Sequence, residues 1–264
     1  MSLGTPAVSA VARPHHPLAS PRLPDQLTLQ HGPCDMLSAF FLVADRLARE
    51  RGVRLSISTD FDELLAVNRA NRSSWESLLP AVDSRYHRLG PDEAFWLRGV
   101  DAAGRVVLTR ACRRVDLGNR NLHDELTSLR LFYDPRIGGG APDDLLFCDC
   151  PSAHQLYGLI SFQAGGWHHP DYRSKGLSAI SSRIVKALAL TMWDVWEWVS
   201  LVDDPLVPHL LPAYGVTTAE PGIEWRRYGE TVRMHMLRMT VAELLPNLTL
   251  FLQRHGGNQP RGAA

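Results

Sequence analysis

Apolar residues recur every three or four positions in several stretches of the chain, which is the spacing of one helical face. The stretch from residue 36 to 51 has this pattern and is followed by Gly52, so it predicts a helix with one buried side. The pattern returns over residues 61–70, 175–192, 205–214 and 241–255. Each of these segments is expected to pack its apolar side against a core.

Runs rich in β-branched and aromatic residues lie between these helices and predict strands. The predicted strands are residues 53–58, 95–100, 106–115, 156–165, 196–201, 223–228 and 231–240. A turn at 101–104 joins the second and third strands, and its Gly104 can take a positive φ, which favours an antiparallel hairpin. The last two strands form another hairpin. This order of strands and helices predicts an α+β fold with a mixed sheet.

The two ends of the chain differ from its middle. Residues 1–33 are rich in proline and show little apolar periodicity, so they are expected to form a mobile tail. Residues 34–52 then form a docking helix, residues 53–240 the main domain, and residues 241–264 a C-terminal helix and tail. Within the main domain, residues 116–155 are less regular and contain Gly138-Gly139-Gly140, so they are interpreted as an insertion.

Composition narrows the class of protein. The 264 residues carry 28 Lys+Arg and 28 Asp+Glu, a balance that argues against a nucleic-acid partner. No stretch approaches the roughly 18 apolar residues that would span a membrane, and the N-terminus lacks a secretory signal pattern. Four cysteines are too sparse for a disulfide framework. These features favour a cytoplasmic protein without a membrane partner.

One short cysteine motif could suggest a metal site. Cys148-x-Cys150 is followed by His154. Zinc takes four ligands, however, and the familiar spacing is C-x2-C with a second ligand pair, which this chain lacks. No metal site is therefore predicted.

Residues 169–178 have the composition of an anion-binding loop. They join a predicted strand to the N-terminus of a predicted helix, where free backbone N–H groups and the helix dipole favour an anion. Ser174, Gly176 and Ser178 are small enough to let a phosphate approach the main chain closely. A pyrophosphate would fit in this loop.

The loop resembles the cofactor motif of the GCN5-related N-acetyltransferases. That motif is Arg or Gln, two residues, Gly, one residue, then Gly or Ala, and Arg173-x-x-Gly176-x-Ser178 matches it except at the last position. Ser178 is still small, so a tight turn survives. Pro170-x-Tyr172 matches the usual lead-in to the motif. The resemblance covers about residues 53–240.

This resemblance implies a mixed, mostly antiparallel sheet with helices on both faces. In such proteins two central parallel strands splay apart at a bulge, and the pantetheine arm of acyl-CoA pairs with the opened edge. Gly165 and Gly166 are the expected bulge residues in this chain.

The resemblance also implies an activity, acyl transfer from acetyl-CoA or another acyl-CoA to an amine by direct attack. The acceptor would be a small-molecule or peptide amine, and a homodimer is compatible with this function. The cofactor-binding residues that it implies are Arg173, Ser174, Lys175, Gly176, Leu177 and Ser178. The insertion is expected to cover the acceptor side of the cleft.

The usual acid of this family is missing. Many relatives carry a Tyr four residues before the Gly that closes the second motif, and counting back from Gly215 reaches Leu211. His168, Tyr214 and His209 are the candidate substitutes, because histidine titrates near neutral pH and tyrosine can donate a proton. The alternative function is a non-catalytic acyl-CoA-sensing or partner-binding module, which Leu211 would favour.

Overall fold

The structure of the protein is a computed structural model that describes residues 21–137, 143–227 and 229–257. Its eight-stranded sheet has the order β1-β2-β3-β5-β6-β8-β7-β4. The strands are β1 Arg54–Ser58, β2 Ala94–Val100, β3 Val106–Asp116, β4 Leu145–Cys148, β5 Leu159–His168, β6 Glu197–Asp203, β7 Thr218–Arg227 and β8 Glu230–Thr240. Within the described part of the chain, β5 and β6 pair in parallel and the other neighbours pair antiparallel.

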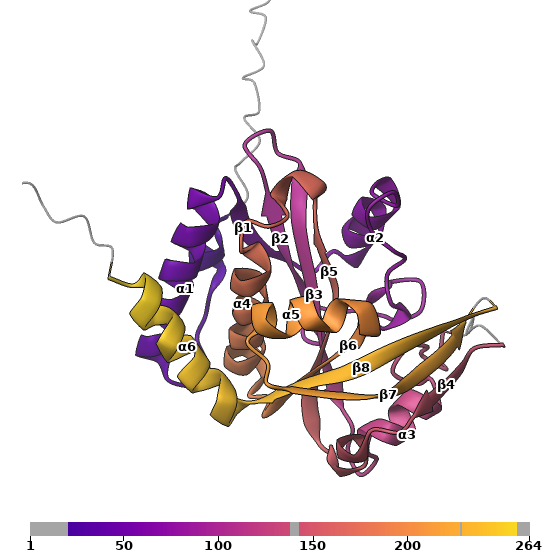
Figure 1. Cartoon of the computed structure of the whole chain (residues 1–264). Helices are drawn as coiled ribbons and strands as arrows, with labels where there is room; N and C mark the ends of the chain where they lie inside the picture. Colours follow the sequence, from indigo (N-terminus) through magenta and orange to yellow (C-terminus); the bar gives the residue numbers. More distant parts are fainter. Residues whose placement is uncertain (1–20, 138–142, 228, 258–264) are drawn as a thin grey trace, which may run out of the picture.

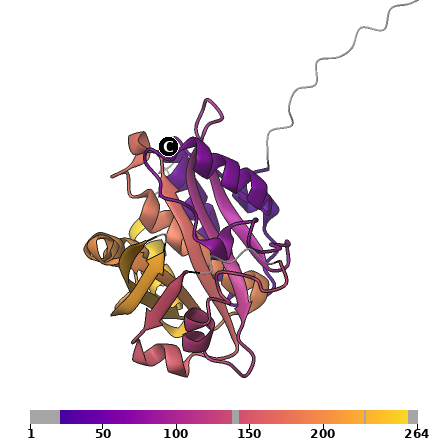
Figure 2. The ribbon, with the colours of Figure 1, turned by 90° about the vertical axis from the view of Figure 1, so that its right-hand side faces the viewer.

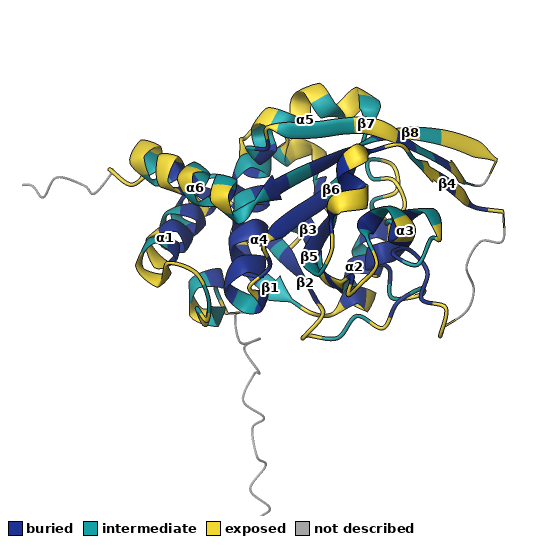
Figure 3. Ribbon diagram, turned by 90° about the horizontal axis from the view of Figure 1, so that it is seen from below, coloured by how far each residue is buried: buried dark blue, intermediate teal, exposed yellow. Residues whose placement is uncertain are grey.

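Helices cover both faces of this sheet (Figure 1). The helices are α1 Cys34–Glu50, α2 Phe61–Ala70, α3 Leu122–Thr127, α4 Leu177–Trp193, α5 Val207–Tyr214 and α6 Val241–His255. Helices α1, α4 and α6 share one large apolar core with the sheet, whereas α3 and α2 belong to two smaller cores on the other face. In Figure 3, α4 is dark blue along most of its length, because it lies between the sheet and the outer helices.

The parallel pair diverges after a short contact. Pairing between β5 and β6 is limited to Ile160–Phe162 against Glu197–Val199, although β5 runs on to His168 and β6 to Asp203. Beyond this vertex β6 continues with β8, while β5 continues with β3. Figure 2 shows the result: β2, β3 and β5 run side by side, and the orange and yellow hairpin of β7 and β8 stands apart from them.

A bulge in β5 accompanies this divergence. In the pairing with β3, Thr109 faces Trp167 and Ala111 faces Ala164, so Arg110 alone opposes Gly165 and Gly166. Gly165 has a φ of 61°, a conformation that glycine adopts without steric cost. The prediction of the bulge residues is confirmed. The diverging parallel pair with helices on both faces is the architecture that the resemblance implies, and the predicted fold class is confirmed as well.

The predicted N-terminal tail is wrong for residues 21–33. Leu23, in a 3-10 turn at Leu23–Gln26, is fully buried in the large core. The Gln26 side chain accepts a hydrogen bond from the Ile57 backbone N–H and donates one to the Ile57 carbonyl. The segment therefore packs beside β1, which proline content alone does not exclude. Residues 1–20 lie outside the described residues.

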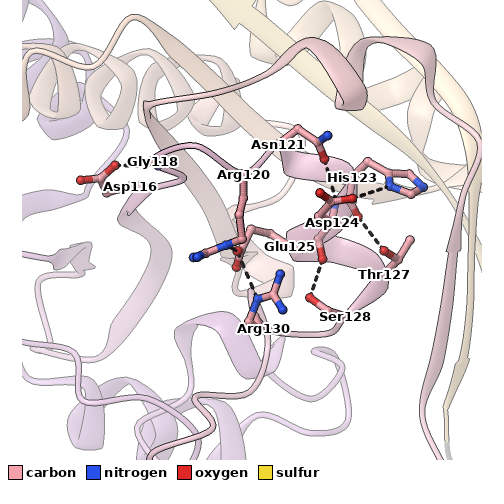
Figure 4. A network of polar contacts seen from close by, with 10 residues as sticks. All are labelled: Asp116, Gly118, Arg120, Asn121, His123, Asp124, Glu125, Thr127, Ser128 and Arg130. Carbon is pink, nitrogen blue, oxygen red and sulfur yellow. Dashed lines mark hydrogen bonds and ion pairs between the residues drawn. The ribbon is translucent and has the colours of Figure 1, made fainter.

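The insertion contains a short helix and a strand. The spacing of Leu122, Leu126 and Leu129 predicts one shared helical face, but the helix of the structure is too short to include Leu129. Helix α3 ends at Thr127, and Leu129 takes a φ of 61°, so Leu129 cannot continue the helical face. Glu125 is nearly buried and pairs with both Arg120 and Arg130, while Asn121 caps the helix (Figure 4). Strand β4, which the sequence does not predict, pairs with β7. The expected break at Gly138-Gly139-Gly140 lies outside the described residues.

No helix in the described part of the chain is both long enough and apolar enough to cross a membrane.

Candidate active site

The loop between β5 and α4 presents free backbone donors. Ser174 and Gly176 both adopt the left-handed conformation, with φ of 60° and 71°. Gly176 is the N-cap of α4 and makes no side-chain cap hydrogen bond, so no side chain occupies the first N–H groups of the helix. A Cβ built on Gly176 meets nothing within 4 Å. The space in front of the helix N-terminus is open, as the predicted pyrophosphate site requires.

Neighbouring elements hold this loop in place. Arg173 folds back, so its Nη2 donates to the Ser74 carbonyl at 2.8 Å and its Nε donates to the His168 carbonyl at 3.2 Å. Arg51, at the end of α1, donates to the Lys175 carbonyl at 2.7 Å. Arg173 thus acts as a brace for the loop in this conformation rather than as an outward-pointing phosphate ligand. The backbone N–H groups of residues 174–178 are left as the candidate anion-binding groups of the loop.

A group of polar side chains lies where β5 and β6 part, on the face that carries α4. Strand register explains why they share this face: Gln163 pairs with Cys112 and His168 with Leu108, and both partners lie in the large core on the α4 side. The side-chain amide nitrogen of Gln163 is buried and lacks a hydrogen-bond partner. The group consists of Arg110, Gln163, Lys186 and Tyr214, and we call it the vertex cluster. His168 lies on the same face farther along β5, at the end of the strand.

A narrow cavity opens inside this cluster. It has a volume of about 10 Å³, roughly room for one water, and is lined by Gln163, Lys186 and Tyr214 together with Val199 and Ser200 of β6. Val199 is the last β6 residue that pairs with β5. The cavity therefore marks the vertex from which the two strands separate.

Arg110 and Tyr214 meet across the cluster. The Arg110 guanidinium carbon lies 4.3 Å from the centre of the Tyr214 ring, a cation–π contact, and Arg110 Nε donates to Ser181 Oγ at 3.4 Å. The same guanidinium lies against Gly166, since a Cβ there would meet it at 3.1–3.4 Å. Tyr214 is buried at the end of α5, so this predicted residue does reach the vertex.

His168 lies at the end of β5 and is neutral at physiological pH. Burial lowers its pKa to about 3, and the nearby Arg110 and Arg173 guanidinium groups lower it further in the same direction. Its Nε2 is buried without a hydrogen-bond partner. A general acid must carry a proton at the working pH, and His168 does not.

The remaining predicted acid lies away from the vertex. His209 is exposed on α5, whereas Leu211 on the same helix packs against the large core. The structure thus brings Tyr214 and His168 to the diverging strands and leaves His209 outside. For metal ions, no group of three or more His, Cys, Asp or Glu side chains in the described ranges is arranged to hold one.

Lys186 belongs to the vertex cluster, although it is not among the candidate site residues predicted from the sequence. It lies in the middle of α4 and is 3% exposed. The available signal was a single lysine inside an otherwise apolar stretch of the helix, from Ile184 to Leu190. Buried lysines without an acidic partner are rare, because a charged amine loses its hydration there.

The opposite face of the sheet carries carboxylates near the same opening. Asp203 ends β6 and shares its face with Val199 and Leu201, which belong to the core on the α3 side. Burial raises the pKa of Asp203, and the negative charges of Asp204 and Glu76 raise it as well. A cationic group approaching from this face would meet negative charge.

The comparison with solved structures finds acyl- and acetyltransferases. The chain is similar to FeeM, an N-acyl amino acid synthase from uncultured soil microbes, at 13% identity and a TM-score of 0.42, over 76% of this chain and 97% of that one. It is similar to the aminoglycoside acetyltransferase AAC(6')-Ib, solved with coenzyme A and kanamycin, at 11% identity and a TM-score of 0.40. That match covers 74% of this chain and 98% of that one. It is also similar to a spermidine N-acetyltransferase from Vibrio cholerae, solved with CoA and spermine, at 9% identity and a TM-score of 0.39. That match covers 72% of this chain and 98% of that one. No family model and no curated protein matches the chain.

Proposed function

We propose that the protein is an acyl-CoA-dependent N-acyltransferase that transfers its acyl group to an amine by direct attack. The divergence of β5 from β6 after Phe162 and Val199 is the observation that carries this proposal. The freed edge of β5 runs from the vertex cluster to the loop at residues 174–178. A pantetheine arm lying along that edge would place pyrophosphate on the loop and the thioester at the vertex.

The acceptor would approach from the other face of the sheet. Asp203 lies there at the end of β6, and its charge attracts a protonated amine. The amine must lose a proton before it attacks the thioester carbon, and Asp203 with its raised pKa suits that transfer better than an ordinary aspartate does. Amines that are protonated at neutral pH are the acceptor class that this face suits.

The departing thiolate needs a proton, and the three predicted donors differ in position. His168 is neutral at physiological pH and His209 is exposed on α5. Tyr214 alone of these three lines the vertex cavity, where its neighbour is Lys186.

One observation favours the alternative function, an acyl-CoA-sensing module without catalysis. Leu211 occupies the position of the usual acid of the resembled family and packs against the core, where it cannot donate a proton. A protein of this kind would bind acyl-CoA and release no CoA when amines are added. The two functions therefore differ in turnover and agree in ligand.

Calorimetric titration with CoA, acetyl-CoA and longer acyl-CoAs tests the shared part of both functions. Binding with 1:1 stoichiometry is expected, and the preferred chain length identifies the acyl group. A second assay follows thiol release while small amines and peptides with a free N-terminus are added. Release of CoA supports the acyltransferase; tight binding without release across all acceptors supports the sensing module. Failure of every CoA derivative to bind would overturn both.

A further inference from the structure

Lys186 is held so that one of its three donors is left for a ligand. Its Nζ donates to Ser182 Oγ at 2.6 Å and to the Tyr214 carbonyl at 3.2 Å. An ammonium group has three N–H donors and no acceptor. The third donor has no hydrogen-bond partner among the described residues. Because Lys186 lines the vertex cavity, a group that entered the cavity would lie beside it.

No negative charge within the described part of the chain pairs with the two cations of the vertex cluster. Arg110 and Lys186 are each 3% exposed, and the ion pairs of the structure include neither of them. A buried cation is stabilised by a partner of opposite charge and is costly without one. The cluster therefore suits a ligand that develops negative charge at the vertex.

The groups facing Lys186 from each neighbouring element are cationic or neutral. Arg110 faces it from β3 and Arg183 from its own helix, and burial together with these charges lowers the pKa of Lys186 well below its usual value. Cys112 faces it from β3 as a neutral thiol, since burial raises the Cys112 pKa to about 12. Gln163 of β5, Tyr214 of α5 and Arg238 of β8 line the same cavity, and Arg238 is already paired with Glu197. The Lys186 ammonium is thus a stronger acid than a lysine in water.

We infer that Lys186 is the catalytic residue that protonates the departing CoA thiolate, a role that rests on the proposed acyltransferase function. As the amine nitrogen bonds to the thioester carbon, the C–S bond breaks and its electron pair stays on sulfur. The free N–H of Lys186 gives its proton to that sulfur, forming the CoA thiol. The acceptor nitrogen loses two protons, one before it attacks and one as the amide forms. The neutral amine of Lys186 takes up one proton from solvent, so the reaction releases one proton in all.

The pKa values of the lysine donor and the thiol explain why a lysine can protonate the thiolate in place of a tyrosine. A free thiol has a pKa of about 8.5 and an ordinary lysine about 10.4, so lowering the lysine value brings the two closer and makes the transfer more favourable. Ser182 and the Tyr214 carbonyl fix the nitrogen, so they are positioning groups. Leu211 is then compatible with catalysis.

Turnover of two variants tests the role. Lys186→Met removes the proton donor and Lys186→Arg keeps the charge but cannot be deprotonated, so both should lower kcat by about a hundredfold or more. CoA affinity should change little. Arg46→Met, which removes a cation that pairs with Glu50 on α1, is the control and should keep kcat within about threefold of the wild type. A folded Lys186→Arg protein with near wild-type kcat would overturn the inference.

Titration of bound CoA gives a readout independent of turnover. The ultraviolet absorbance of the CoA thiolate reports its ionisation in the complex. A cation at the sulfur lowers the thiol pKa by about one unit or more. Lys186→Met should therefore raise the thiol pKa by about one unit, which is a tenfold smaller ionisation constant, while Lys186→Arg should leave the thiol pKa low. An identical thiol titration in wild type and Lys186→Met would show that Lys186 does not touch the sulfur. Absence of CoA binding to the wild type would instead overturn the proposed function.

The pH dependence of kcat in the wild type tests the inference even if Lys186→Met fails to fold. The kcat of the wild type should fall on the alkaline side as Lys186 loses its proton, at a pH below the usual lysine pKa. Lys186→Arg should lack this limb, because arginine keeps its proton throughout the range. The same alkaline limb in both proteins would assign the titration to another group and overturn the inference.

Discussion

At the scale of single residues, a substitution of Gly176 tests most directly whether the loop at residues 174–178 binds CoA. It has a φ of 71°, and no atom lies within 4 Å of its Cβ position, so a phosphate has room to approach the main chain there. Gly176→Glu should abolish CoA binding, because its carboxylate would occupy the place of the pyrophosphate. Calorimetric titration measures the affinity.

Gly118→Glu is the matched control for that variant. Gly118 also has a positive φ, 56°, and nothing within 4 Å of its Cβ position, but it follows β3 far from the loop. Both variants therefore carry a similar backbone strain and the same new charge. Equal CoA affinity in folded Gly176→Glu and Gly118→Glu proteins would remove the loop from the binding site.

Tyr214 can be separated into its hydroxyl, its ring and its carbonyl. Tyr214→Phe keeps the ring stacked on Arg110 and the carbonyl that holds Lys186, so we expect a loss of turnover below about tenfold. Tyr214→Ala removes the ring and should cost considerably more. The measurement is kcat with a saturating acyl-CoA. A hundredfold loss in Tyr214→Phe would assign the proton to the tyrosine hydroxyl instead of Lys186.

At the scale of elements, the bulge in β5 depends on two glycines with different constraints. Gly165 needs its positive φ, so Gly165→Ala should lower the free energy of unfolding by about 1–2 kcal/mol. Gly166 has no positive φ, and the atoms nearest to its Cβ position belong to the Arg110 guanidinium. Gly166→Ala should therefore cost less stability. Urea denaturation of both variants checks the difference, and a larger loss in Gly166→Ala would contradict this assignment of the strain.

The insertion at residues 116–155 contributes side chains to the core that lies next to the vertex. Leu122, Leu126 and Phe132 are fully buried, and the Phe132 ring contacts Phe162, the last β5 residue paired with β6. Deleting residues 118–142 would thus remove core side chains directly beneath the vertex. Its proposed role in covering the acceptor side is better tested by substitutions on the exposed surface of α3 than by deletion.

At the scale of the whole molecule, buried neutral histidines make stability depend on pH. Burial lowers the pKa of His87 to about 4, and the Arg113 guanidinium, 3.1 Å away, lowers it further. In the unfolded chain His87 binds a proton near pH 6.5, whereas in the folded protein it does so only near pH 4. The stability that neutral His87 contributes is therefore fully present above pH 6.5 and is lost as the pH falls toward 4. His87 contributes up to about 2 kcal/mol of this loss between pH 6.5 and 5.

Urea denaturation at pH 7.5 and 5 measures this effect. His87→Gln keeps a side-chain acceptor for Arg113 and removes the titration, so its stability should change less between the two values of pH. His168, with a pKa of about 3, adds a similar loss that the variant retains. A His87→Gln protein with the same pH dependence as the wild type would show that His87 is protonated in the folded state.

The sequence alone determined the elements whose signals are local. The apolar periodicity of α4, the hairpin of β2 and β3 with its Gly104 turn, and the glycines of the β5 bulge all follow from residues a few positions apart. The cofactor loop is local for the same reason, since the small residues and the helix start adjoin each other. The resemblance then supplied the idea of diverging strands, which no local pattern contains.

Only the tertiary structure decided which side chains meet. Leu23 is buried because β1 and α1 enclose it, and proline content could not show this. Lys186 and His209 look alike in sequence as single polar residues on apolar helices, yet one lies at the vertex and the other is exposed. Burial depends on contacts between segments far apart in the chain, here between α4, β3 and α5. The charge environment that makes Lys186 acidic exists only after those contacts form.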